Sequence, residues 1–268
     1  MEVATTPFKS IVCGVEGGPS SAEAARQAVA ISSPDTELRF ITVHTSFEPG
    51  PDNHRDRLEE GLTRACQMAE QSGVSASADM KEGRYATEVL LSEGREHDLL
   101  VLGTQGSSRA SGMVFGSTAS ETAHQAEHPV LIAREPPEPR EFPKKILFAS
   151  DGTAGSWAPA RTVGQLAAAF DASVEVLHVE DGKDGDRGPV LDEQLAELAE
   201  LAGAEPAALR GSGPPVQVII DAAKERKASM IVCGRRGLRG IKALGSVSEK
   251  VVHGADCSVL LVPAGEAA

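Results

Sequence analysis

The stretch Leu100–His124, LVLGTQGSSRASGMVFGSTASETAH, joins an apolar run to a loop of small residues and then to a segment that favours a helix. Four glycines lie within it: Gly103, Gly106, Gly112 and Gly116. Glycine lets the backbone turn with positive φ and lets a ligand approach without a Cβ in the way. We therefore expect Gly103 to end a buried strand in such a turn, with a ligand bound beside the loop.

Short apolar runs on both sides of this stretch alternate with longer amphipathic segments. In the first half, continuous Val, Ile and Leu predict strands buried on both faces at Ser10–Val15, Leu38–Val43, Asp98–Gly103 and Pro129–Ala133. Helices are predicted between them at Ser20–Ile31 and Asp56–Gln71. Because strands that alternate with helices pair in parallel through right-handed crossovers, the predicted fold class is α/β, with a doubly wound sheet.

The same order of elements repeats after the segment Glu135–Lys145, EPPEPREFPKK, which carries four prolines in eleven residues. Proline fixes φ and removes a donor, so this segment is predicted to be an extended linker outside either core. The next apolar runs are Lys145–Ser150, Ser173–Val179, Ser229–Gly234 and Ser258–Pro263. The chain is therefore predicted to be a duplication, with a first domain at residues 1–134, a linker at 135–144 and a second domain at 145–268.

Composition narrows the possible partners. The 268 residues carry a formal net charge of −13 and include one Trp, one Tyr and seven Phe. An acidic surface with few aromatic side chains disfavours nucleic acid, which requires basic faces or stacking platforms. The four cysteines form no C-x-x-C motif, which argues against a zinc site. Since no apolar run is long enough for a membrane span or a leader, we expect no membrane partner and a cytoplasmic location.

The end of the opening stretch suggests an anion site. Gly116, Ser117 and Thr118 open the predicted helix, where unpaired N–H groups and the positive end of the helix dipole favour a phosphate. The Ser117 hydroxyl can donate to a phosphate oxygen, but it can equally act as a helix cap. Thr118 and Glu121 also fit a capping box. The loop predicts a phosphorylated ligand and leaves the role of each hydroxyl open.

The spacing Gly103-x2-Gly106-x9-Gly116-Ser117 after the fourth apolar run resembles the nucleotide-binding signature of the universal stress protein family. The resemblance extends to IVCGVEGGPSSAEAARQA and HPVLIAR in the first half, and to ILFASDGT and GSVSEKVVHGADCSVLLVP in the second. It implies a tandem member with two five-stranded parallel sheets of the adenine nucleotide alpha hydrolase-like kind. Because members commonly dimerise through the last strand, it also implies that Ala133 and Val262 lie together across a pseudo-twofold axis. A further homodimer between chains is left open.

The resemblance implies ATP or a related adenine nucleotide as ligand, with Mg²⁺ arriving on its phosphates. The acidic position after the first strand, near the nucleoside, is Glu16, and the adenine contact is Val43. The ribose and phosphate contacts are Gly103, Thr104, Gln105, Gly106, Gly116, Ser117 and Thr118. Glu16 departs from the usual Asp, which moves the carboxylate by more than a bond length.

The second half departs from the family pattern in the opposite way. Asp151 restores the usual acid, and the implied loop contacts are Gly234, Gly237, Gly245 and Ser246. This loop is two residues shorter than the first, a difference of roughly 6 to 7 Å of extended chain. Four basic residues, Arg235, Arg236, Arg239 and Lys242, gather there and could attract phosphate, although a solvated loop is the alternative. We expect the first half to bind nucleotide better.

No residues suggest fast catalysis. The sequence lacks a G-x-S-x-G motif, and the Asp181–Asp186 segment lacks the terminal Glu of a calcium loop. The predicted function is regulatory adenine-nucleotide binding with an unidentified protein partner. The alternatives are an interaction protein of the same fold that binds no nucleotide, or a slow ATPase.

Overall fold

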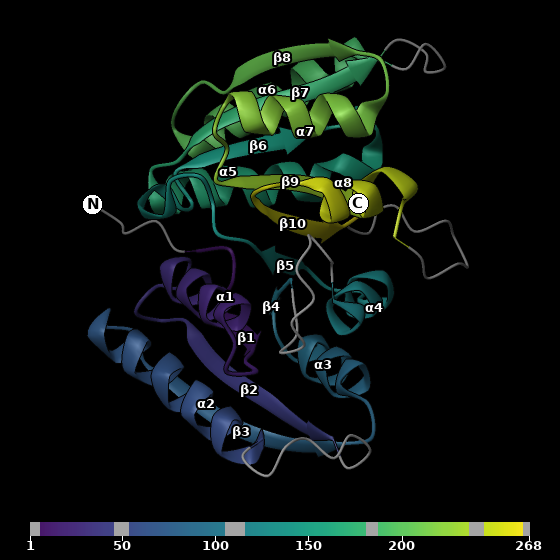
Figure 1. Cartoon of the computed structure of the whole chain (residues 1–268). Helices are drawn as coiled ribbons and strands as arrows, with labels where there is room; N and C mark the ends of the chain where they lie inside the picture. Colours follow the sequence, from purple (N-terminus) through teal and green to yellow (C-terminus); the bar gives the residue numbers. More distant parts are fainter. Residues whose placement is uncertain (1–5, 46–53, 105–115, 181–186, 236–243, 265–268) are drawn as a thin grey trace. The chain divides into compact units, whose positions relative to one another are not determined.

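The computed structural model describes residues 6–45, 54–104, 116–180, 187–235 and 244–264. These residues pack into two compact units. The N-terminal half is Phe8–Arg134, and the C-terminal half comprises the residues from Glu135 onward together with Thr6 and Pro7. Each half is a parallel β-sheet flanked by helices (Figure 1).

The N-terminal half follows a strict alternation of strand and helix. Its elements are β1 (Ser10–Gly14), α1 (Pro19–Ala30), β2 (Glu37–Thr45), α2 (His54–Gln71), β3 (Ala76–Gly83), α3 (Ala86–Arg95), β4 (Leu99–Gly103), α4 (Ser117–Gln125) and β5 (Val130–Ala133). The strands lie in the order β3-β2-β1-β4-β5, and all pair in parallel. The order reverses between β1 and β4, so the carboxyl ends of these two strands frame the crevice where a doubly wound sheet binds ligands.

The C-terminal half repeats this plan after a short 3₁₀ helix, η1 (Pro139–Glu141). Its elements are β6 (Lys145–Ala149), η2 (Ala154–Ser156), α5 (Trp157–Phe170), β7 (Ser173–Glu180), α6 (Gly188–Ala202), β8 (Ala207–Ser212), α7 (Pro215–Glu225), β9 (Met230–Arg235), α8 (Ser246–Gly254) and β10 (Ser258–Pro263). The parallel strand order is β10-β9-β6-β7-β8. The switch point lies between β6 and β9.

Helices cover both faces of each sheet. In the N-terminal half, α1 packs with α2 on one face and α3 packs with α4 on the other (Figure 1). In the C-terminal half, α5 packs with α6, and α7 packs with α8. The central strands are covered on both sides, so Ile11, Phe40, Leu147 and Phe148 are fully buried. None of the helices in the described part of the chain is long and apolar enough to span a membrane.

All eight strands predicted from apolar runs are present, with ends within two residues of the expected positions. The fifth strand of each sheet, β3 or β8, had no apolar run to reveal it, because these edge strands are largely polar and partly exposed. The expectation of a wholly extended linker is wrong. Residues 139–141 form η1, and Phe142 is buried, because an aromatic side chain gains more from burial than the proline-rich backbone gains from solvation.

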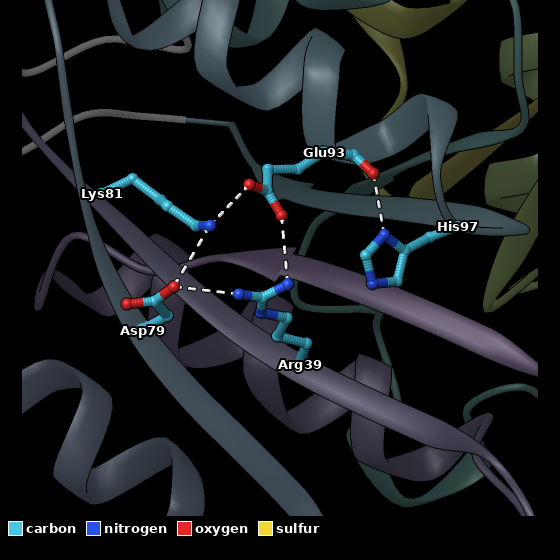
Figure 2. A network of polar contacts seen from close by, with 5 residues as sticks. All are labelled: Arg39, Asp79, Lys81, Glu93 and His97. Carbon is cyan, nitrogen blue, oxygen red and sulfur yellow. Dashed lines mark hydrogen bonds and ion pairs between the residues drawn. The ribbon is translucent and has the colours of Figure 1, made fainter.

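A network of charged side chains fastens the edge strand β3 to its neighbours (Figure 2). Asp79 Oδ2 lies 2.9 Å from Arg39 Nη2 and 3.1 Å from Lys81 Nζ. The Glu93 carboxylate of α3 completes the ring, 2.9 Å from Lys81 Nζ and 3.4 Å from Arg39 Nη1. His97 Nδ1–H donates to the Glu93 carbonyl at 2.7 Å. The network therefore joins β2, β3 and α3 by charge where apolar packing is thin.

Candidate functional site

A pocket opens at the carboxyl ends of β1, β2 and β4 in the N-terminal half. Its volume is about 340 Å³, within the usual range of small-molecule sites. Six of the residues predicted from sequence line it: Glu16, Val43, Gly103, Gly116, Ser117 and Thr118. Gln105 and Gly106 lie outside the described residues. The name N-terminal pocket is used for this cavity below.

Helix α4 points its first turn at the N-terminal pocket. Gly116 is the N-cap with φ −61° and ψ 143°, and no side chain among the described residues caps the helix. Ser117, Thr118 and Ala119 follow in the first turn and line the pocket. Because N–H groups of the first turn have no intrahelical acceptor, they are available to an anion. The first turn of α4 therefore meets the N-terminal pocket with N–H groups that have no intrahelical acceptor.

Two capping predictions are wrong. Ser117 and Thr118 are the first and second helical residues, so neither is the N-cap. Glu121 does not return to the helix start, because it accepts hydrogen bonds from Thr87 Oγ1 at 3.0 Å and Gln125 Nε2 at 3.1 Å. Glu121 thus links α4 to α3, and the hydroxyls of Ser117 and Thr118 are left at the pocket wall.

Glycine is needed at Gly103 for a different reason from the one expected. Neither Gly103 nor Gly116 adopts positive φ. A Cβ on Gly103 would instead lie 2.6 Å from both the carbonyl oxygen and the Oγ of Ser20. The next residue, Thr104, does not line the pocket: its Oγ1 lies 3.3 Å from Ser20 Oγ, and its carbonyl accepts from Gly116 N–H at 2.6 Å. Gly103 therefore permits the close packing of α1 on β4 that shapes the site.

Positive φ is required one strand away, in the turn after β1. Gly17 has φ +75°, and a Cβ there would lie 2.6 Å from the carbonyl oxygen of Arg57. This turn presents the exposed Glu16 side chain at the pocket mouth. Ile41, Leu58 and Leu90 form an apolar wall nearby, which the sequence did not reveal because such residues read as core. The pocket thus combines an acidic rim, an apolar wall and a helix start.

A second pocket, the C-terminal pocket, occupies the corresponding position beyond β6, β7 and β9. It has a volume of about 220 Å³ and is lined by the predicted residues Asp151, Gly234, Gly245 and Ser246. Gly237, Arg236, Arg239 and Lys242 lie outside the described residues. Gly245 caps α8 with φ −62° and ψ 143°, the same backbone geometry as Gly116. The duplicated halves therefore reproduce the helix start closely.

The polar groups of the C-terminal pocket are bound to one another. Asp151 Oδ1 accepts from Thr153 N–H at 2.9 Å and from Thr153 Oγ1 at 2.7 Å. Ser150 Oγ donates to Gln194 Oε1 at 2.7 Å, and Gln194 Nε2 donates to Ser156 Oγ at 2.9 Å. Ser150, Ser156 and Gln194 are buried and bonded to one another, and the half-buried Asp151 is bonded to Thr153. The acid that the family resemblance associates with the nucleoside is thus already engaged by its own loop.

Arg235 and Cys233 also line the C-terminal pocket. Arg235 is only 8% exposed, so the alternative of a solvated loop is wrong for this residue, which lies at the end of β9. Desolvation by burial raises the pKa of the Cys233 thiol to about 12, against a smaller opposing effect of its hydrogen bond with Ser248. The thiol is therefore protonated at neutral pH and is not a nucleophile.

Metal ligands are not clustered in the described parts of the chain. No group of three or more His, Cys, Asp or Glu side chains that could hold a metal ion occurs there. The Asp181–Asp186 segment lies outside the described residues.

Comparison with known proteins places these features in a family. The model of the universal stress protein family matches residues 7–134 and 143–263. A universal stress protein of Mycobacterium tuberculosis is 25% identical over 94% of this chain and 95% of its own. One from Methanocaldococcus jannaschii is 30% identical over 48% of this chain and 84% of its own.

Two other matches define the extent of the likeness. The chain spans about half (48%) of the length of two further M. tuberculosis relatives. The crystal structure of a universal stress protein from Archaeoglobus fulgidus superposes with a TM-score of 0.78 at 19% identity, covering 97% of this chain and 98% of that one. That structure shares the tandem α/β fold over nearly the whole length. With both halves matched by the family model, the chain belongs to the universal stress protein family.

Proposed function

We propose that the protein binds ATP or a related adenine nucleotide in the N-terminal pocket, as a regulatory ligand without fast turnover. The observation that supports this most strongly is the convergence of six expected contact positions on one cavity with the first turn of α4. A helix start that no side chain caps is a favourable environment for phosphate oxygens. An apolar wall and an acidic rim beside it suit a nucleoside.

The residues present fit an adenine nucleotide in two parts. The N–H groups that open α4, with the Ser117 and Thr118 hydroxyls, would hold phosphates close to Gly103. Val43, Ile41 and Leu90 would pack on the base, and the Glu16 carboxylate would accept from a sugar hydroxyl. Mg²⁺ would bind the phosphate oxygens and water, since it needs few protein ligands when a nucleotide supplies oxygens.

The described lining of the N-terminal pocket supports binding over rapid hydrolysis. Glu16 and His54 are its ionisable residues, and it includes no Lys or Arg. Rapid phosphoryl transfer requires a positioned base, a cationic clamp and a carboxylate that holds the metal. Slow hydrolysis remains an alternative, as does an interaction protein that binds no nucleotide. The internally bonded Asp151 and Gln194 of the other half favour the latter for that half.

The test uses the purified full-length chain. Protein is denatured, the released small molecules are identified by mass spectrometry, and stripped protein is titrated with ATP and Mg²⁺ by calorimetry. We expect co-purified adenine nucleotide or saturable binding, with phosphate release far slower than ligand exchange. Absence of both bound nucleotide and binding heat would support the interaction-protein alternative. Phosphate release at the rate of exchange would instead identify an ATPase.

A further inference from the structure

Thr42 carries an unusual hydroxyl. The residue lies near the carboxyl end of β2, is 1% exposed, and lines the N-terminal pocket. Its Oγ1 is buried and has no hydrogen-bond partner among the residues that the structure describes. Buried hydroxyls without partners are rare in native proteins, because their desolvation is not compensated. Because Thr42 also lines the pocket, a ligand bound there can supply the missing partner.

The strand order places this hydroxyl at a specific end of the pocket. β2 and β4 lie on either side of β1, so Thr42 and Gly103 are separated by two strand spacings, roughly 9 to 10 Å. Gly103 adjoins the start of α4, where phosphates are proposed to bind. Thr42 therefore lies at the opposite end, beside Val43 and the apolar wall, which is the end suited to the nucleoside.

In the C-terminal half, the residue at the equivalent position has a hydrogen-bond partner within the protein. Gly14 pairs with Ile41 on β2, and Ala149 pairs with Leu177 on β7, so Thr42 and His178 follow at equivalent positions. His178 is buried, and its Nδ1–H donates to the Ser150 carbonyl at 3.0 Å. The imidazole thus has a protein acceptor where the Thr42 hydroxyl has none among the described residues.

We propose that the Thr42 hydroxyl hydrogen-bonds the nucleoside part of the ligand and is a specificity-determining residue of the N-terminal pocket. This inference rests on the proposed nucleotide binding. A threonine hydroxyl both donates and accepts, so it can pair with a base edge or a sugar hydroxyl. A site that includes a buried polar partner discriminates against ligands that leave that partner unpaired.

The experiment compares Thr42→Val with Thr122→Val in the full-length protein. Valine keeps the shape of threonine and removes the hydroxyl. Thr122, on α4, is a matched control, because it is also fully buried with an unpartnered Oγ1, and it does not line the pocket. ATP affinity is measured by calorimetry, tripolyphosphate affinity by competition, and stability by thermal unfolding.

We expect Thr42→Val to weaken ATP binding about three- to tenfold, the effect of one neutral hydrogen bond, and to leave tripolyphosphate binding unchanged. Its thermal midpoint should stay level or rise, because a buried unpaired hydroxyl has been removed. Thr122→Val should show the same stability trend with unchanged ATP binding. Thr42→Ser, which restores the hydroxyl, should regain most of the affinity.

Three outcomes would overturn the inference. Thr42→Val could bind ATP as tightly as the parent, its affinities for ATP and tripolyphosphate could fall together, or Thr42→Ser could bind as weakly as Thr42→Val. A parent protein that binds no ATP would instead reject the proposed function, so the two failures are distinguishable.

Discussion

The two halves share one fold and differ in how they treat the polar atoms at the ends of their strands. In the N-terminal half, Glu16 is exposed at the pocket mouth, and the Thr42 hydroxyl has no partner among the described residues. In the C-terminal half, Asp151 is held by Thr153 and His178 by Ser150. The crevice is therefore present in both halves, but the hydrogen bonding differs: Asp151 and His178 have partners within their own half, and the Thr42 hydroxyl has none among the described residues.

This difference has an energetic consequence. A ligand that enters the C-terminal pocket must compete with the hydrogen bonds of Asp151 and His178, whereas one that enters the N-terminal pocket can supply a partner for the Thr42 hydroxyl. Buried networks whose members are all satisfied are rigid and expensive to open. We therefore expect nucleotide to prefer the N-terminal half, even though the C-terminal half has the acid more usual in the family.

The largest expected effect comes from Gly116→Val in the full-length chain. The substitution places a branched side chain on the pocket wall at the start of α4, where backbone N–H groups would bind phosphate. Loss of two charge-assisted contacts, at about 1.5 to 3 kcal/mol each, lowers affinity by about two to four orders of magnitude. The fold should persist, since φ −61° and ψ 143° are accessible to valine. ATP affinity is measured by calorimetry on the folded variant.

Gly245→Val is the matched control, because Gly245 has the same backbone geometry at the start of α8. If the N-terminal half binds the nucleotide, this control keeps the affinity of the parent. A loss confined to Gly245→Val would reverse the ranking of the two halves.

A smaller effect, on stability, is expected from Gly103→Ala. The added Cβ would lie 2.6 Å from the backbone carbonyl oxygen of Ser20, so α1 must shift away from β4. Overpacking of this kind costs about 1 to 3 kcal/mol in the free energy of unfolding. Because the chain forms two compact units, hydrogen exchange with mass spectrometry should accompany the thermal melt and localise the loss to residues 8–134.

Gly234→Ala tests the same strand position in the other half. There a Cβ would meet Pro159 at 3.6 Å and the carbonyl oxygen of Gly155 at 3.8 Å, which are ordinary contacts. We expect the free energy of unfolding to stay the same or to rise by up to about 1 kcal/mol, because alanine restricts the conformations of the unfolded chain. If Gly103→Ala and Gly234→Ala lowered stability equally, the closer packing of helix on strand at Gly103 would not explain the need for glycine there.

A small effect is expected from Asp79→Asn in the charged network on β3. The hydrogen bond from Lys81, followed by that from Arg39, lowers the pKa of Asp79 below its ordinary 3.8. Hydrogen bonding to Glu93, and then to Asp79, raises the pKa of Lys81 above 10.5. Exposed ion pairs contribute little to stability, so we expect the free energy of unfolding to fall by at most about 1 kcal/mol near neutral pH.

The pH dependence gives this prediction its sign. A lowered carboxyl pKa adds stability that is present above the unfolded value and is lost as pH falls through the folded one. The raised Lys81 pKa adds stability that is present below 10.5 and is lost as pH rises through its folded value. Thermal midpoints of parent and Asp79→Asn should therefore converge in acid. The control is Glu175→Gln, which removes a single ion pair, 3.3 Å long, with Arg226. It should lower the free energy of unfolding by less than Asp79→Asn does. A larger loss would contradict the stability assigned to the network.

Much of the architecture could be predicted from sequence, because buried parallel strands consist of continuous runs of apolar residues. The repeat of those runs predicted two α/β halves. The glycine loop after the fourth strand pointed to Gly103 and Gly116, and the family resemblance pointed to Glu16; all three line one cavity. The proposed packing of Ala133 and Val262 across a pseudo-twofold axis stays a prediction. The polar edge strands escaped detection, because their stability comes from hydrogen bonding and charge pairs.

The details of the site depend on contacts that sequence spacing does not encode. The need for glycine at Gly103 arises from Ser20, 83 positions earlier, and the hydrogen bond of Ser150, in the loop after β6, depends on Gln194 in α6. The contact of Asp151 with Thr153, by contrast, spans two residues and is a turn pattern that local sequence could have indicated. Hydrogen bonds within a local turn can be predicted from sequence, whereas contacts between residues far apart in the chain cannot.

The charges on β3 also affect how copies of the chain behave toward one another. β3 is the outer strand of the N-terminal sheet, and a free strand edge is a template onto which another chain can add by β-pairing. Asp79, Lys81 and Glu82 place ions along that edge, and any incoming strand would have to desolvate them. We therefore expect the ion-pair network to disfavour β-pairing with another chain at this edge, as well as to fasten the strand.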